Sequence, residues 1–174
     1  LDLHKQMQDQ SFSDVEFLVG GQMLYAHRVI LAARSEYFRK LLSSGMIETK
    51  SSDACTETSR CAISIPDFEP AVVKRLICWL YCSIIEAPLL IDEGIALSHL
   101  ADQYLLDELK SSCARHLEKH VQLETVVKLL QASLSCRSPM LERTCLNFVV
   151  AHEDALMKHS SFLQCTNVDV VLGS

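Results

Sequence analysis

The stretch from Ser13 to Phe38 restricts the possible fold more than any other part of the chain. It begins with alternating residues, which is the pattern of a strand with one buried face. One face of this strand carries Val15, Phe17 and Val19, and the other carries Glu16 and Leu18. Gly20 and Gly21 follow, and glycines readily adopt the positive φ angles of a tight hairpin turn. Met23 to Ala26 then return as a second short strand, so the sequence predicts a β-hairpin over 15–26.

The periodicity changes to that of a helix at His27. Val29 to Ala33 is an apolar run, which predicts a short helix that is too apolar to lie on the surface. Ser35 is a favourable N-cap for a following helix, which we expect to continue through Phe38 and to end near Gly45. A hairpin that leads directly into two buried helices is therefore the organising unit of the chain.

These segments resemble the core signature of the BTB/POZ domain. The matching residues are Ser13-Asp14-Val15, Ala26-His27-Arg28 and Leu31-Ala32-Ala33-Arg34-Ser35-Glu36-Tyr37-Phe38. The segment LSHLADQYLLDELKSSCARHL, at 97–117, is similar to the last two helices of such domains, so the resemblance covers nearly the whole chain. It implies an α+β fold in which helices surround a small mixed β-sheet.

The remaining elements are read from the residues themselves. Ala62 to Ile65 alternates as a short strand that a proline ends. Pro70 stands in the first turn of a strongly amphipathic helix. We expect Asp92 to cap the next helix, which breaks near Asp107 before another helix follows. A purely helical fold is the alternative, and the two hairpin glycines oppose it.

We predict two units, a BTB/POZ domain at 1–118 and a helical hairpin at 119–174. In the second unit, Val126 to Leu130 forms one helix, and Ser138-Pro139 is an N-cap and first-turn pair that opens another. Placed directly after a BTB domain, this pair of helices resembles the 3-box, which opens the BACK domain. We expect the BACK domain to be truncated here, in a chain that begins without Met and is cut from a longer protein.

Composition argues against several classes of partner and compartment. The net charge of −6 disfavours binding to nucleic acid, which needs clustered Lys and Arg. No window holds the ~18 apolar residues of a transmembrane helix, so we expect no membrane insertion. The eight cysteines contain no C-x-x-C pair, which favours buried free thiols and a cytoplasmic or nuclear location. Cys55 and Cys61, in a polar loop, are expected to be the most accessible.

The search for catalytic chemistry is negative. The glycine pair is not followed by Lys-Ser or Lys-Thr, as a phosphate loop requires, and there is no G-x-S-x-G motif. His116 and His120 have the spacing of a zinc-binding pair on one helix, but no third ligand suggests itself, and a solvated helix face explains them better. A Cys–His nucleophile pair stays open, although nothing marks one of the cysteines. We predict no enzyme activity, no metal and no cofactor.

Two features of the resemblance concern self-association. In BTB domains a helix at the position of Leu1 to Gln10 packs across a two-fold interface, which implies a homodimer with Leu3 and Met7 in that interface. A helix this short is marginal in water and needs such a partner face; a frayed terminus is the alternative. Asp14 and Arg28 match a charged pair in a pocket near the interface, with either a structural or a partner-binding role. A tetramer of the potassium-channel type leaves no place for the helical hairpin.

Met46, Ile47 and Glu48 follow the second helix of the signature. Cullin-binding BTB domains carry a hydrophobic-x-Glu motif at this place, and an exposed apolar residue beside a charge suits an interface. In that family the 3-box forms the groove for the N-terminal extension of the cullin. The resemblance therefore implies an adaptor that links cullin-3, in a ubiquitin ligase, to a substrate held by a module outside this chain. A dimerisation scaffold that recruits a corepressor in a nuclear regulator is the alternative, and the long loop at 49–61 leaves the affinity for cullin open.

Overall fold

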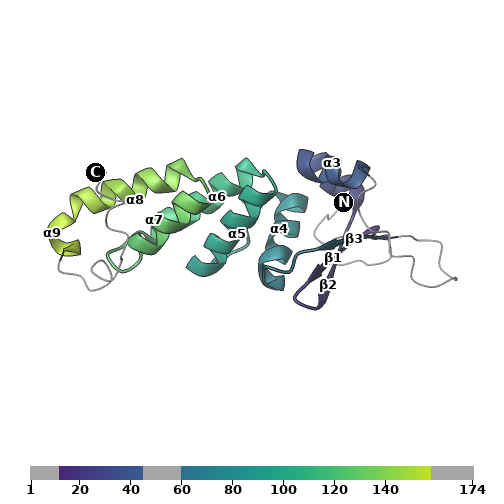
Figure 1. Cartoon of the computed structure of the whole chain (residues 1–174), viewed down its shortest axis with the longest axis horizontal. Coiled ribbons are helices and arrows are strands. Elements are labelled where there is room, and N and C mark those ends of the chain that lie inside the picture. The colour runs from purple at the N-terminus through teal and green to yellow at the C-terminus, as the bar shows by residue number, and fades with distance from the viewer. Residues whose placement is uncertain (1–11, 45–59, 158–174) are drawn as a thin grey trace.

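The computed structural model describes residues 12–44 and 60–157 (Figure 1). In chain order its elements are β1 Val15–Val19, β2 Gln22–Ala26, α2 Arg28–Arg34, α3 Glu36–Ser43, β3 Cys61–Ser64, α4 Pro70–Cys82, α5 Ile91–Gln103, α6 Asp107–Leu117, the 3-10 helix η1 Glu118–His120, α7 Val126–Ser135, α8 Pro139–Ala151 and α9 Glu153–Leu156. The described part is elongated, with the sheet at one end and α7 to α9 at the other. None of its helices combines the length and the apolar character that a membrane span requires.

β1 is the central strand of a three-stranded sheet with the order β2–β1–β3. It pairs antiparallel with β2, where Val15 lies opposite Ala26, and parallel with β3, where Val15 lies opposite Cys61. Gly20 and Gly21 have φ angles of 53° and 79°, as the predicted hairpin turn requires. The predicted α+β fold with a small mixed sheet is confirmed.

The inner face of β1 packs against helices in a sheet core, to which β1, β3 and α2 to α6 all contribute. Its aromatic centre joins Phe17 of β1, Phe38 of α3 and Tyr104 at the end of α5. The rings of Phe17 and Phe38 meet edge to face with centroids 6.0 Å apart, and those of Phe38 and Tyr104 are 5.0 Å apart. Both phenylalanines are fully buried, so the ring contacts add to the stability gained from burial.

A second cluster, the hairpin core, joins α7 and α8 to the helices before them. It consists of Ala114, Leu117, Val126, Leu129, Leu130, Leu141, Cys145 and Leu156. α6 contributes to both clusters, since Leu109 and Cys113 lie in the sheet core and Ala114 and Leu117 lie in the hairpin core. The two helices predicted after 119 therefore form a hairpin that shares its apolar core with α6.

A polar network fixes the turn between α7 and α8 against α5 and α6. Asp102 of α5 accepts hydrogen bonds from Lys110 at 2.9 Å and from Arg137, in that turn, at 2.8 Å. Arg137 has a φ of 50°, and the Ser138 N–H donates to the Ser133 carbonyl at 2.8 Å, which is the bond of a Schellman C-cap. The hydrogen bond from Arg137, together with Lys110, holds the pKa of Asp102 below its usual range, although burial opposes this shift.

Of the N-caps of α3 and α5, one agrees with the sequence-based prediction, and the other does not. Ser35 is the N-cap of α3, and its hydroxyl accepts a hydrogen bond from the Phe38 N–H at 3.3 Å, as predicted. The prediction that Asp92 caps α5 is wrong, because the helix begins at Ile91 with Leu90 at the N-cap. Asp92 lies in the first turn instead, where a carboxylate is favoured by the helix dipole.

Two predictions of burial are wrong. α2 is not a buried helix, since Leu31 is its one buried residue and Val29 is 74% exposed. Cys61, expected in an accessible loop, is 1% exposed because it begins β3 and pairs with Val15. Five of the six cysteines in the described part are buried as free thiols, which agrees with the prediction for the cysteines as a group.

We expect Phe38→Ala to lower the free energy of unfolding by ~3–5 kcal/mol, because it leaves a cavity between Phe17 and Tyr104. Urea denaturation followed by circular dichroism measures this loss. Lys40→Ala, on the exposed side of the same helix, is the control and should change the free energy of unfolding by less than about 0.5 kcal/mol. Similar losses in the two variants would contradict the aromatic centre of the sheet core.

We expect Asp102→Asn to reduce stability by about 1 kcal/mol at pH 7, since it removes the charge that Lys110 and Arg137 share. A carboxyl group with a lowered pKa in the folded state stabilises the fold above its unfolded pKa, about 3.9 for Asp. That contribution is lost as the pH falls through the folded pKa, so the difference from wild type should shrink below pH ~4. Urea titrations at several pH values measure it. Asp107→Asn, whose carboxylate is 89% exposed beside Lys110, is the matched control, and a difference independent of pH would refute the network.

Candidate functional site

Asp14 and Arg28, predicted as a charged pair, are brought together through the backbone. The Arg28 N–H donates a hydrogen bond of 2.6 Å to Oδ1 of Asp14. Both residues are exposed, and no ion pair joins their side chains within the described ranges. Asp14 thus satisfies one of the free N–H groups in the first turn of α2, which differs from the desolvated charge pair that the resemblance implies.

A second contact at the start of α2 is absent from the sequence-based predictions. The Tyr81 hydroxyl of α4 accepts a hydrogen bond from the His27 N–H at 3.0 Å and lies 2.6 Å from Nδ1 of the same histidine. The Tyr81 hydroxyl therefore joins α4 to the start of α2 through both the backbone and the ring of His27. Burial is the main cause that raises the pKa of Tyr81 to about 12, so the hydroxyl stays protonated at neutral pH.

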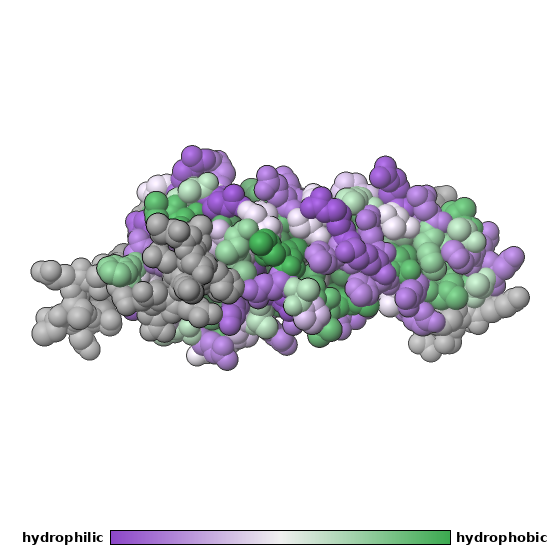
Figure 2. Space-filling model, turned by 180° about the vertical axis from the view of Figure 1, so that it is seen from behind, coloured by the Kyte–Doolittle hydropathy of each residue, from purple (hydrophilic) through white to green (hydrophobic). Residues whose placement is uncertain are grey.

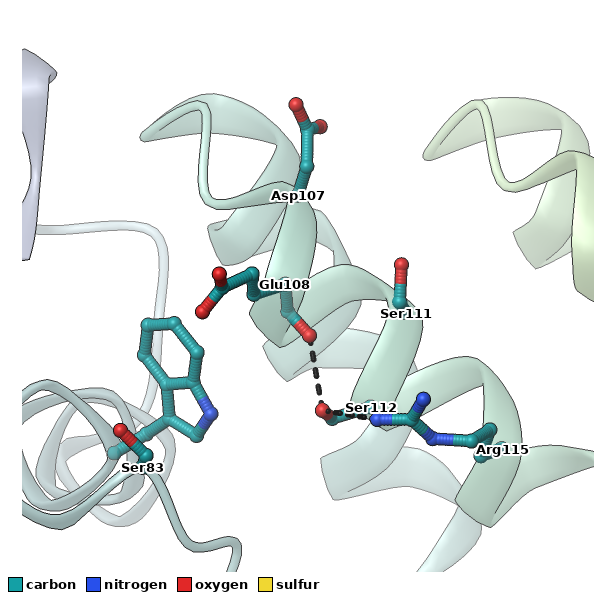
Figure 3. A pocket seen from close by; sticks show the side chains of 7 residues that line it. Ser83, Asp107, Glu108, Ser111, Ser112 and Arg115 are labelled. Atoms are coloured by element: carbon teal, nitrogen blue, oxygen red, sulfur yellow. Dashed lines mark hydrogen bonds between the residues drawn. The ribbon is translucent and has the colours of Figure 1, made fainter.

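A polar pocket of about 360 Å³ lies between the end of α4 and the outer side of α6 (Figure 3). Ser83 faces it from the end of α4, and Glu108, Ser112 and Arg115 face it from α6. Arg115 donates to the Ser112 hydroxyl at 2.9 Å, and that hydroxyl donates to the Glu108 carbonyl at 2.9 Å. Ser112 and Arg115 are therefore bonded to each other and to the backbone of α6 at the edge of the pocket.

Trp79 forms the inner wall of this pocket and is 4% exposed. The Arg34 guanidinium of α2 lies 5.6 Å from the centre of its ring, in cation–π geometry. Arg34 also donates to the Leu80 carbonyl at 3.1 Å and to the Ser83 hydroxyl. One arginine therefore ties α2 to the end of α4 and holds the pocket wall in place.

Neither the zinc-binding histidine pair nor a nucleophilic cysteine is supported by the described residues. His116 belongs to α6 and His120 to η1, so they do not share one α-helix, and no group of three metal-ligating side chains occurs in the described part. Burial raises the pKa of Cys113 to about 12, and burial is also the main cause that raises those of Cys78 and Cys145 to about 11. A nucleophilic cysteine needs a lowered pKa, so these three thiols are unsuited to catalysis.

Several predicted interface residues lie outside the described residues. They are Leu3 and Met7 of the proposed dimer helix, and Met46, Ile47 and Glu48 of the proposed cullin motif. The face seen in Figure 2 carries apolar side chains in scattered patches between hydrophilic ones. Val29 of α2 and Val150 of α8 are among the most exposed, at 74% and 78%.

The chain is similar to known proteins in both sequence and fold. The BTB/POZ domain model matches residues 3–121. The chain is 33% identical over 163 residues to BTB/POZ domain-containing protein 9 of Drosophila melanogaster, and 30% identical over 146 residues to the ARM repeat protein interacting with ABF2 of Arabidopsis thaliana. These alignments cover 92% and 84% of this chain but 21% and 19% of the relatives, so the chain spans about a fifth of their length. The BTB domain of zebrafish PATZ1 has the same fold, with a TM-score of 0.52 at 23% identity over 68% of this chain and 86% of that chain.

We expect Asp14→Ala to lower the free energy of unfolding by about 1 kcal/mol, the usual effect of losing a helix cap. Asp14→Asn keeps an acceptor oxygen and should retain most of the stability, and Arg28→Ala should have little effect because the bond uses its backbone. Thermal and urea denaturation of the three variants measure these differences. A loss in Arg28→Ala as large as in Asp14→Ala, with strong coupling in the double variant, would instead support a charge pair.

Proposed function

Because this chain belongs to the BTB/POZ family, we propose that it is a homodimerising adaptor that links a substrate to a cullin-3 RING E3 ubiquitin ligase. BTB domains are protein-interaction domains rather than enzymes, and they generally dimerise. The substrate would be held by a module outside these residues. As part of the same proposal we place the protein in the cytosol or nucleus, where the buried thiols stay reduced.

The observation that carries this proposal is the hairpin core. Ala114 and Leu117 of α6, the last long helix of the region that the family model matches, are 1% exposed in an apolar core that they share with α7 and α8. The Drosophila relative aligns over 163 residues, well beyond the end of the family match at residue 121. A hairpin that is packed against the BTB domain and shared with a relative supports its assignment as a 3-box, which is the element that distinguishes cullin adaptors in the resemblance.

The arrangement of the helices also supports a common cullin-binding face. α3, α6 and α8 lie along the same, upper edge of the molecule in Figure 1. Met46, Ile47 and Glu48 follow α3 in the sequence, and the pocket of Ser83, Glu108 and Arg115 opens beside α6. In the proposal, Met46 inserts into the cullin as an apolar anchor, Ile47 supports it and Glu48 bonds beside it.

The exposed side chain of Val29 supports the proposed homodimer. It lies on α2 and is 74% exposed, and residues 27–38, which include α2, form the second part of the dimer interface in the proposal. A partner subunit that covers this helix removes an apolar surface from water. Leu3 and Met7 complete the interface in the proposal.

We expect Met46→Ala and Glu48→Ala each to weaken binding to the N-terminal domain of cullin-3 by about thirty-fold, since truncating an interface hot spot costs ~2 kcal/mol or more. Isothermal titration calorimetry with the full chain measures the affinity. Thermal denaturation should be unchanged in both variants.

Lys74→Ala, on the exposed side of α4, is the matched control and should bind cullin-3 as wild type does. If the Met46/Glu48 double variant binds cullin-3 as tightly as wild type, the motif has no role in cullin binding. The alternative function, a dimerisation scaffold that recruits a corepressor, is then favoured. If wild type itself shows no binding, the adaptor proposal fails as a whole.

A further inference from the structure

A groove of about 690 Å³ lies where the segment before α4 meets the N-terminal half of α5. Its volume falls in the range of ~300–1,000 Å³ that is typical of sites for ligands. None of its lining residues comes from α3, α6, α7 or α8, so it is distinct from the proposed cullin-binding face.

The floor of the groove is apolar and lies at the junction of the two cores. Phe68 and Ala96 pack on the edge of the sheet core, and Ile95 packs on the edge of the hairpin core. These three side chains are half-buried, while Val72 beneath them is 4% exposed. The floor therefore offers apolar surface to a partner without a change in the fold.

The rim of the groove carries four carboxylates, of which two form ion pairs within the described ranges. Asp92 pairs with Lys128, and Glu93 pairs with Arg75 at 3.0 Å. Asp67 and Glu69 are exposed, and within the described ranges neither forms an ion pair. The groove thus combines an apolar floor with uncompensated negative charge at its edge.

We propose that this groove binds a basic, amphipathic peptide segment of a partner protein. Aliphatic or aromatic side chains of the segment cover Phe68 and Ile95, and its Lys or Arg side chains approach Asp67 and Glu69. Charge complementarity selects such a partner. A second copy of this acidic chain, with a net charge of −6, complements the rim poorly.

The test measures fluorescence anisotropy of a labelled helical peptide of about 15 residues, with Leu along one face and Lys on its flanks. The full chain should bind it saturably, and more weakly as salt is added. The same peptide with Glu in place of Lys should bind at least about five-fold more weakly.

The double variant Asp67→Asn/Glu69→Gln should bind the Lys peptide about five-fold more weakly than wild type. Glu153→Gln/Asp154→Asn, at exposed residues of α9, removes the same total charge and should leave the affinity unchanged. Ile95→Ala, which shrinks the floor, should also weaken binding without changing the salt dependence. This variant tests the floor independently of the rim.

Equal weakening of binding in the two double variants overturns the proposal, because the peptide then responds only to net charge, and an unchanged affinity in the Asp67/Glu69 variant overturns it too. Equal binding of the Lys and Glu peptides overturns it as well. Light scattering of the Asp67/Glu69 variant reveals whether a second copy of the chain fills the groove: a change in molecular mass counts against a peptide partner, and an unchanged mass supports it.

Discussion

The buried face of β1 holds the described sheet in register. Among the described strands it alone is paired on both edges, and Val15, Phe17 and Val19 on its inner face are all inaccessible to water. Burial of a side chain of this kind is worth about 1.5–3 kcal/mol. Because side chains alternate along a strand, a shift of one residue would place Glu16 and Leu18 in the core. One face of one strand therefore fixes both the hairpin register and the parallel pairing with β3.

α6 carries this order into the helical hairpin. Leu109 and Cys113 face the sheet core, and Leu117, one turn further along, faces the hairpin core. α5 approaches α6 closely here, since a Cβ atom added at Gly94 would lie 2.9 Å from a methyl carbon of Leu117. The packing is continuous across residue 118. A chain that ended there would expose Ala114 and Leu117, so point substitutions separate the function of the hairpin from its structural role better than truncation does.

Local patterns predict the elements of this fold, but long-range contacts decide several of its details. The alternation around Phe17, the glycine pair and the cap at Ser35 depend on neighbouring residues, and these predictions are confirmed. Cys61 is buried because it pairs with Val15 of β1, which lies forty-six residues earlier in the chain. A polar sequence context gives no sign of such a partner.

The same distinction applies to the candidate site. The family resemblance pairs Asp14 with Arg28, but it does not show that the backbone N–H of Arg28 is the donor. The bond between His27 and Tyr81 spans fifty-four residues, and the groove beside Phe68 forms only when α4 and α5 pack together. No local sequence pattern predicts this bond or this groove, because both depend on which elements pack together in the folded chain.

The polar groups of the pocket and the thiols of the cores are already engaged or buried in the described part. The pocket beside α6 bonds its own hydroxyl and guanidinium groups internally, and the elevated pKa values of Cys78, Cys113 and Cys145 keep these thiols protonated at neutral pH. What the fold leaves to solvent is apolar area, such as Val29 on α2, and carboxylate charge, such as Asp67 at the groove. Apolar area and charge select partners through shape and complementarity.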